Sequence, residues 1–139
     1  MTAEQIEKLM NEMNLPWSVV VRNMWNIDDP DDSLPGVTVS IESSEKSGAE
    51  IVKFVTFICD VPHDAGPEFF LEFLRLNFRV DHGTFALESK SELCYIDTLE
   101  LEGLDPGEFK ATLSAMQRAP QIFQEKYDID LYTMGKPQF

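Results

Sequence analysis

The stretch that decides the fold runs from Pro67 to Leu104 and opens with the apolar segment PEFFLEFLRLNFR at residues 67–79. Pro67 suits the first position of a helix, where its missing N–H is not needed for a hydrogen bond. The charged side chains recur at helical spacing and share one narrow stripe: Glu68, Glu72, Arg75 and Arg79. Nearly every other position is Phe or Leu. The pattern therefore predicts a helix over residues 67–79 that is covered on most sides, with Phe73 and Leu76 in the core.

A β-hairpin is predicted after this helix. Asp81-His82-Gly83 ends the helix, and the apolar segments Thr84–Leu87 and Leu93–Leu99 then flank a polar turn at residues 88–92. Two apolar segments of strand length around a short polar turn are typical of paired antiparallel strands.

The start of the last helix carries the clearest local signal in the chain. Asp105 fits the N-cap, Pro106 the first helical position and Glu108 the third. Apolar residues then recur at helical spacing. Pro120 lies within this run, and because proline removes a helical hydrogen bond, the sequence predicts a kink or break near Ala119.

The first residues form another amphipathic pattern. Thr2 and Gln5 match a capping box, in which two side chains satisfy backbone N–H groups at the start of a helix. Apolar residues follow at spacings of three and four positions: Ile6, Leu9, Met10 and Met13. The pattern predicts a short helix with one apolar face.

Three strands are predicted between this helix and residue 67. They cover Trp17–Trp25, Val37–Ile41 and Glu50–Val61, with polar connections between them, which is typical of an antiparallel meander. The third strand is apolar on both faces and should lie centrally in the sheet. The sequence thus predicts a single α+β domain over residues 1–139. Its element order is α-β-β-β-α-β-β-α, with an antiparallel sheet packed against helices.

The composition excludes several classes of function. Twenty-five acidic residues face eleven basic ones, giving a formal charge of −14, which disfavours binding to nucleic acid or to an anionic membrane surface. The charge favours solubility or, alternatively, an acidic face for a basic partner. No apolar run approaches the ~20 residues of a membrane span, and Met1–Met13 lacks the order of a signal peptide. We therefore expect a cytoplasmic protein.

No pattern predicts a catalytic residue, a cofactor or a metal site. Cys59 and Cys94 lie in predicted strands and should be buried free thiols, since nothing indicates an oxidising compartment. The aspartates at residues 26–36 lack the spacing and the glycine of a calcium-binding EF-hand loop, so a solvated turn is expected. His63-Asp64 and Asp81-His82 are the only histidine–acid pairs. Both suit turns or caps better than catalysis.

Motifs around the central helix and the hairpin carry a family resemblance. They are Leu74-Arg75-Leu76-Asn77, His82-Gly83-Thr84-Phe85-Ala86-Leu87, Glu92-Leu93, Asp97-Thr98-Leu99 and Glu102-Gly103-Leu104. Together with the element order, they resemble the type III secretion chaperone-like superfamily, most closely the YbjN family, described as bacterial sensory transduction regulators. The resemblance covers most of the chain. It implies a small acidic bacterial protein, usually a homodimer, that binds another protein.

Three hypotheses about function follow from the sequence. The first is a non-enzymatic protein-binding module, chaperone-like or regulatory, that acts through protein–protein contacts. The second is a small enzyme with an unrecognised site near His63, Asp64 and His82. The third is an acidic mimic of nucleic acid. The first agrees best with the missing catalytic patterns and with the resemblance.

A partner-binding patch is predicted where the first helix meets the first strand. If the central and last helices cover one face of the sheet, only the short first helix remains for the other face. Part of the following set should then be solvent-reachable: Ile6, Leu9, Met10, Met13, Trp17 and Val19. A partner segment would dock there by groove binding or strand addition. The alternative is that these residues close the core.

A homodimer is also expected. The helix predicted at residues 67–79 has more apolar perimeter than one sheet can cover, so a second apolar surface is needed. That surface could come from a second copy or, alternatively, from the first and last helices of the same chain.

Overall fold

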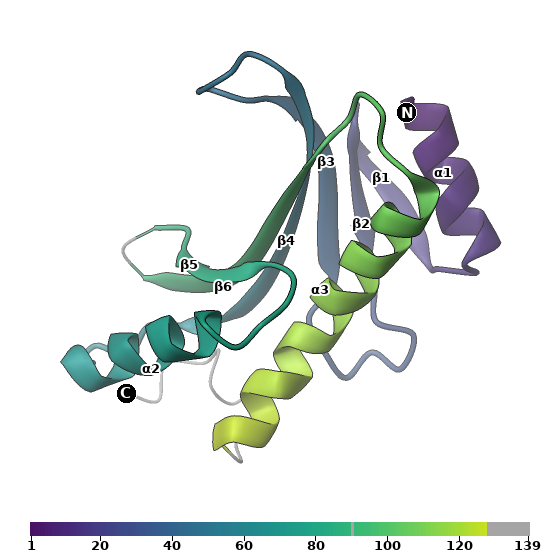
Figure 1. Cartoon of the computed structure of the whole chain (residues 1–139). Coiled ribbons are helices and arrows are strands. Elements are labelled where there is room, and N and C mark those ends of the chain that lie inside the picture. The colour runs from purple at the N-terminus through teal and green to yellow at the C-terminus, as the bar shows by residue number, and fades with distance from the viewer. Residues whose placement is uncertain (90, 128–139) are drawn as a thin grey trace.

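The computed structural model places three helices and six strands within the residues that it describes, 1–89 and 91–127 (Figure 1). In chain order they are α1 (Ala3–Glu12), β1 (Trp17–Val21), β2 (Met24–Ile27), β3 (Val37–Ser43), β4 (Glu50–Asp60), α2 (Pro67–Asn77), β5 (Thr84–Leu87), β6 (Glu92–Glu100) and α3 (Pro106–Tyr127). The predicted α+β class is confirmed, with a first helix, a group of strands, a central helix, two strands and a last helix in the predicted order. Residues 128–139 of the predicted domain lie outside the described residues.

The strands form an antiparallel sheet in the order β1-β2-β3-β4-β6-β5. β1 to β4 follow one another as a meander, and β4 lies centrally between β3 and β6; both features are as predicted. β6 pairs with β4 although α2 and β5 separate them in the chain, and β5 pairs with the outer side of β6. β1 and β5 are therefore the two edge strands.

The segment predicted as one strand, Trp17–Trp25, is a hairpin of two strands. The chain turns at Arg22 and Asn23, so Val19 pairs with Trp25 on the neighbouring strand. Asn23 has a φ of 61°, in the left-handed region that asparagine tolerates better than most residues and that tight hairpin turns use. The apolar residues before Arg22 and after Asn23 suggest one continuous strand, which conceals this turn. The sheet consequently has one strand more than predicted.

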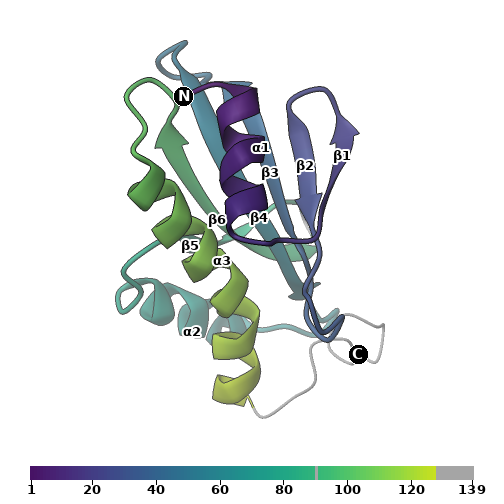
Figure 2. The ribbon, with the colours of Figure 1, turned by 90° about the vertical axis from the view of Figure 1, so that its right-hand side faces the viewer.

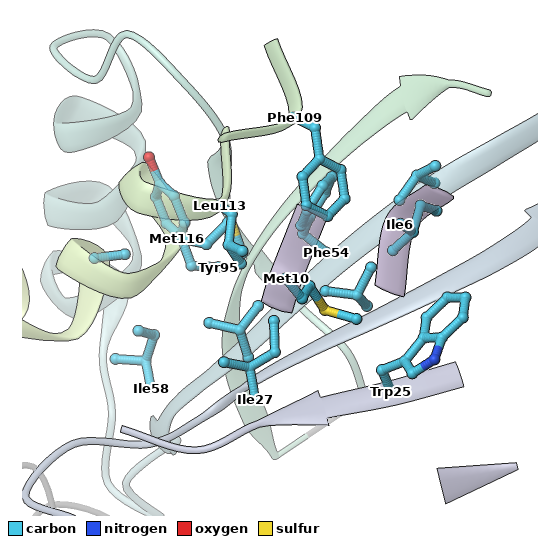
Figure 3. Packing of buried hydrophobic residues seen from close by; sticks show 14 of the residues in the cluster. Ile6, Met10, Trp25, Ile27, Phe54, Ile58, Tyr95, Phe109, Leu113 and Met116 are labelled. Carbon is cyan, nitrogen blue, oxygen red and sulfur yellow. The ribbon is translucent and has the colours of Figure 1, made fainter. Parts of the chain in front are cut away.

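α1 and α3 cover the same face of the sheet, which corrects the expectation that α1 covers the opposite face (Figure 2). Trp25, Val39 and Phe54 are cross-strand neighbours on that face, and each is buried. Phe109 of α3 packs on Phe54, with the ring centroids 5.5 Å apart. Figure 3 shows Met10 of α1 and Phe109 of α3 converging on this region. One core therefore lies between the sheet and both helices.

Side-chain hydrogen bonds fix α1 to the β1–β2 hairpin. The predicted capping box forms at the start of the helix. Farther along, Glu7 accepts a hydrogen bond from the indole N–H of Trp25 at 2.8 Å, and Asn11 accepts one from the indole N–H of Trp17 at 2.9 Å. Glu7 and Asn11 are four positions apart and so lie on one side of the helix. The two bonds set the orientation of α1 on the hairpin.

α2 is more exposed than its sequence predicts. Phe73 is buried, as predicted, and its ring centroid lies 5.1 Å from that of Phe85 and 5.5 Å from that of Phe123. Leu76 is only half-buried. Three apolar side chains of this region are exposed: Leu71, Leu74 and Phe78. The prediction that this helix is covered on most sides is therefore wrong for the single chain. α1 and α3 lie over the other strands, and only one side of α2 contacts the rest of the fold.

α3 continues through Pro120, so of the kink or break predicted near Ala119, the break does not occur. Both residues are buried, and Phe123, one turn later, is fully buried against Phe73. A proline inside a helix costs about 3 kcal/mol, whereas full burial of a phenylalanine stabilises by about 1.5–3 kcal/mol. Burial of the turn that contains Pro120 offsets much of the cost of the missing hydrogen bond.

Thr56 of β4 offers a test of this core. Its side chain is fully buried, and its hydroxyl has no hydrogen-bond partner among the described residues. Leaving a buried hydroxyl unsatisfied costs about 1–3 kcal/mol. Thr56→Val replaces that hydroxyl by a methyl group of similar size, so we expect the free energy of unfolding in urea to rise by about 1 kcal/mol.

The matched control for this substitution is Thr56→Ser. It retains the hydroxyl and removes the methyl group, so it should lower the free energy of unfolding by about 1 kcal/mol. A Thr56→Val protein that is less stable than the wild type would contradict the expectation.

Candidate protein-binding surface

Half of the predicted partner-binding patch belongs to the core. Ile6, Leu9 and Met10 are at most 7% exposed and pack between α1 and the sheet. They could contact a partner only if α1 left the sheet, which would break its bonds to the β1–β2 hairpin. These three residues therefore close the core, the alternative that the sequence left open.

The reachable part of the patch lies at the end of α1 and on β1. Met13 and Trp17 are half-buried. Val19 is 57% exposed, and its neighbours Val20 and Val21, which the sequence did not single out, are 53% and 57% exposed. Their composition is that of a buried strand. They are in solvent because β1 is an edge strand and α1 reaches it only at its start, where Asn11 bonds to Trp17.

The two edge strands differ in how their outer backbone is satisfied. At β5, the Asn77 side chain accepts a hydrogen bond from the Phe85 N–H at 2.7 Å and donates one to the Phe85 carbonyl at 3.2 Å. This amide takes the place of a neighbouring strand. At β1, no loop or side chain among the described residues bonds to the outer backbone of Ser18–Val21. The N–H and C=O groups of such an edge can pair with another chain.

A second apolar surface lies between α2 and β5. A hollow of about 420 Å³, which we call the α2–β5 groove, is lined chiefly by apolar side chains: Phe70, Phe73, Leu74, Phe85, Leu87 and Leu93. Its rim is exposed, since Leu74 is 63% and Leu87 is 50% exposed. Phe78, at the end of α2, is 93% exposed. An apolar hollow beside exposed large apolar residues is typical of a protein-binding surface.

The loop between β2 and β3 is acidic and is closed by its own hydrogen bonds. The Asp29 carboxylate accepts bonds from the Ser33 N–H at 3.0 Å, the Ser33 hydroxyl at 3.1 Å and the Leu34 N–H at 3.3 Å. Asp31 and Asp32 are exposed. Among the described residues, no group of three or more His, Cys, Asp or Glu side chains is placed to hold a metal ion.

The residues of the enzyme hypothesis lie in two separate loops. His63 and Asp64 are exposed between β4 and α2, and His82 is exposed before β5. A hollow of about 200 Å³ lies beside His82, where residues of β6 and α3 also line it, but His63 and Asp64 are not part of its lining. The three side chains therefore do not meet in that hollow.

Three buried groups hold their protons more tightly than usual. Cys59 and Cys94 are buried free thiols, as predicted. Burial, with a smaller effect of Asp60, raises the pKa of Cys59 to about 12. Burial, with a smaller effect of Glu88, raises the pKa of Cys94 to about 11. Burial likewise raises the pKa of Tyr95 to about 12. Thiols with such values stay protonated at neutral pH and are poor nucleophiles.

Comparisons with known proteins agree with the fold. A family model described as CesT_Tir_1 matches residues 1–127. An uncharacterized protein from Methanothermobacter thermautotrophicus, known from a crystal structure, is similar with a TM-score of 0.62 at 15% identity, over 91% of this chain and 99% of that chain. No curated protein matches. None of the helices in residues 1–89 and 91–127 is long and apolar enough to cross a membrane. The narrower resemblance to the YbjN family stays a prediction.

The raised pKa values predict a loss of stability at alkaline pH. Because Cys59, Cys94 and Tyr95 bind their protons more tightly in the folded protein than the usual values of 9.0 and 10.0, their contribution is fully present below pH 9. It is lost as the pH rises towards the folded values. We expect the free energy of unfolding in urea to fall steadily from pH ~9 to pH ~11.

The control for this titration is the double variant Cys59→Ala, Cys94→Ala. It removes two of the three titrating groups, so its free energy of unfolding should decline less steeply over the same pH range, whatever its value at neutral pH. A decline as steep as that of the wild type would exclude the thiols as its cause.

Proposed function

Because the chain belongs to the CesT_Tir_1 family of type III secretion chaperone-like proteins, we propose that it is a non-enzymatic protein-binding module, chaperone-like or regulatory. The observation that carries this proposal is the exposed edge of β1. Val19, Val20 and Val21 are each more than half exposed on a strand whose outer backbone has no neighbour among the described residues. Apolar exposure of this kind costs solubility and is typical of binding surfaces.

Strand addition is the mode of binding that suits this edge. An extended segment of a partner would pair with the free N–H and C=O groups of β1, and its side chains would contact alternate residues of the strand. Trp17 and Val19 are cross-strand partners of the buried residues Ile27 and Trp25, so they face the α1 side. Met13, at the end of α1, extends the apolar contact. Of the predicted patch, Met13, Trp17 and Val19 would touch the partner, while the buried members support them from beneath.

The binding site is tested with peptides selected from a displayed random library against the whole chain. We expect a selected peptide to slow amide hydrogen exchange at residues 17–21. Lysine on an edge strand discourages pairing with another strand. The double variant Val19→Lys, Val21→Lys should therefore bind the peptide about tenfold more weakly or worse, as measured by fluorescence anisotropy.

The matched control is Leu87→Lys, which places the same charge on an exposed apolar residue of the opposite edge strand. Its affinity for the peptide should equal that of the wild type. Peptides that bind tightly but slow exchange elsewhere, or that bind the β1 variant as well as the wild type, would exclude β1 as the docking site.

We further propose that two copies associate through α2 and the α2–β5 groove. Leu71, Leu74 and Phe78 lie at helical spacing and are exposed beside this apolar hollow. A two-fold interface uses the same surface of both copies, so a residue of one copy fills a hollow of the other. Phe78 is the side chain best placed for that role, since it is almost fully exposed.

The charges of α2 suit a self-complementary contact. Glu68 and Glu72 lie at its start, and Arg75 and Arg79 towards and just beyond its end. Within one chain, Arg75 already lies 3.0 Å from the Glu72 carboxylate and 3.6 Å from that of Glu68. Antiparallel contact of two copies would bring the acidic start of each helix beside the basic end of the other. The formal charge of −14 on each copy opposes association, so apolar contact has to dominate.

The dimer is tested with Leu74→Glu, Phe78→Glu. Both side chains are largely exposed, so the fold should survive, while the loss of two apolar contacts should weaken dimerisation about tenfold or more. Sedimentation velocity at micromolar concentration measures the dimer fraction. Val20→Glu, on the other edge of the sheet, is the control and should leave that fraction unchanged. A wild-type protein that sediments as a monomer at these concentrations would refute the dimer.

We propose, finally, that this protein is a bacterial cytoplasmic member of the YbjN group and that it regulates sensory transduction. Two observations support it. The motifs from Leu74-Arg75-Leu76-Asn77 to Glu102-Gly103-Leu104 resemble that group. Cys59 and Cys94 are free thiols, the state that a reducing compartment maintains.

A further inference from the structure

The edge of β1 carries few of the usual features that keep an edge strand from pairing at random: it is 5 residues long and has a register shift between Val19 and Val21. Its sequence, Trp17-Ser18-Val19-Val20-Val21, contains no lysine, no proline and no other charge, although edge strands are commonly protected in these ways. The other edge of the sheet is protected by the Asn77 amide and by α2. Charge can add to this protection of β1 against pairing with the β1 strand of another copy.

The surroundings of β1 carry negative charge. Residues 1–36, which comprise α1, β1, β2 and the loop to β3, contain seven acidic and two basic side chains, a net charge of −5. The two bases are Lys8 and Arg22. Two copies that approached each other through this edge would bring like charges together, which costs free energy and suppresses the wrong pairing.

The acidic loop begins directly beside the start of β1. The Asp28 N–H donates a hydrogen bond to the Pro16 carbonyl at 3.0 Å, and Pro16 immediately precedes β1. The bonds accepted by Asp29 hold the loop closed and leave Asp31 and Asp32 exposed. In Figure 2 this loop follows the end of β2, which lies beside the start of β1. The acidic loop therefore begins beside the start of a strand added to β1, although Asp29 and Asp31 also line a hollow with Arg118 of α3.

We propose that the partner segment which pairs with β1 is cationic: an extended stretch of another protein in which apolar residues alternate with lysine or arginine. The inference rests on the proposed docking of a segment along β1. The charge that repels a second copy attracts a basic segment, so one feature provides both protection and selectivity. Alternation follows from strand geometry, because successive side chains point to opposite faces and only one face of β1 meets the apolar side of α1.

The test uses two synthetic peptides that share alternating valines and differ only at the intervening positions, lysine in one and glutamate in the other. Their affinities for the whole chain are measured by fluorescence anisotropy, with hydrogen exchange to locate them. At ~0.02 M salt we expect the lysine peptide to bind at least about tenfold more tightly. The ratio should shrink to about threefold or less at ~0.5 M salt, where charges are screened beyond a few ångströms.

A variant with fewer charges in the loop between β2 and β3 tests whether that loop attracts the lysine peptide. Asp31→Asn, Asp32→Asn removes two charges without disturbing the bonds of Asp29. Asparagine also suits the φ of 53° at Asp32. The variant should weaken binding of the lysine peptide about threefold or more at low salt. Asp81→Asn, Glu88→Gln removes the same charge near β5, at the opposite edge, and should leave the affinity within about twofold of wild type.

The outcomes separate this inference from the proposed function. If both peptides bind equally well and slow exchange at residues 17–21, the cationic preference is refuted and docking on β1 stands. If neither peptide slows exchange there, docking on β1 and the preference both fail. If the two charge variants weaken binding equally, the attraction belongs to the net charge of the chain, and the assignment to the acidic loop is refuted.

Discussion

The fold depends on the pairing of β4 with β6. These strands run antiparallel from Ile51–Glu100 to Asp60–Glu92, and the whole of α2 and β5 lies between them in the chain. Closing a loop of that length costs entropy, which the ladder of hydrogen bonds and the burial of Phe54 and Tyr95 must offset. The same pairing places the end of β6 beside the start of β4. α3 begins shortly after that end and packs across β4. Without the pairing, β5 would lose the link that holds it in the sheet, and α3 would lose its contacts with β6.

The same arrangement leaves α2 with too little to contact. α3 lies over β4 and β6, and α1 lies beside it on the same face, bonded to Trp17 and Trp25 of the β1–β2 hairpin (Figure 2). α2 reaches the core through Phe73 and holds β5 through the Asn77 amide, and its remaining apolar residues face outward. Exposed apolar residues on such a helix are unfavourable in water, so contact with a second apolar surface would stabilise it.

The sequence predicted correctly those features that depend only on neighbouring residues. The Thr2 capping box and the Asp105 cap depend on a few neighbouring residues, and both form as predicted. The central place of β4 follows from its two apolar faces. The turn at Asn23 was missed because its flanking residues, Val21 and Met24, read as one continuous strand, and a single asparagine is a weak turn signal.

The candidate site could be predicted only in part, because exposure is a property of the assembled sheet. Ile6 and Met10 have the same spacing in the sequence whether α1 packs on an occupied face or an empty one. Val19 and Val39 likewise belong to similar valine-rich stretches, yet one lies on an edge strand and the other between two strands. Which strands end at the edge is decided by the distant β4–β6 pairing, and that pairing is not encoded near either residue.

The acidic residues are distributed differently around the two exposed apolar surfaces, the edge of β1 and the surface of α2. A uniform negative charge would oppose every association of this chain with itself. The charges on α2 and the two residues after it are instead balanced, two acids against two bases over residues 68–79, although the neighbouring loop and hairpin add Asp81, Glu88 and Glu92. The charges of residues 1–36, which include β1, are one-sided, with seven acids against two bases. A balanced surface can meet its own copy, since opposite charges lie within each contact. A one-sided surface repels its copy and attracts the opposite sign. The charges of α2 and those around β1, more than the sum over the chain, therefore suit the proposed contact of α2 with a second copy and the proposed contact of β1 with a different chain.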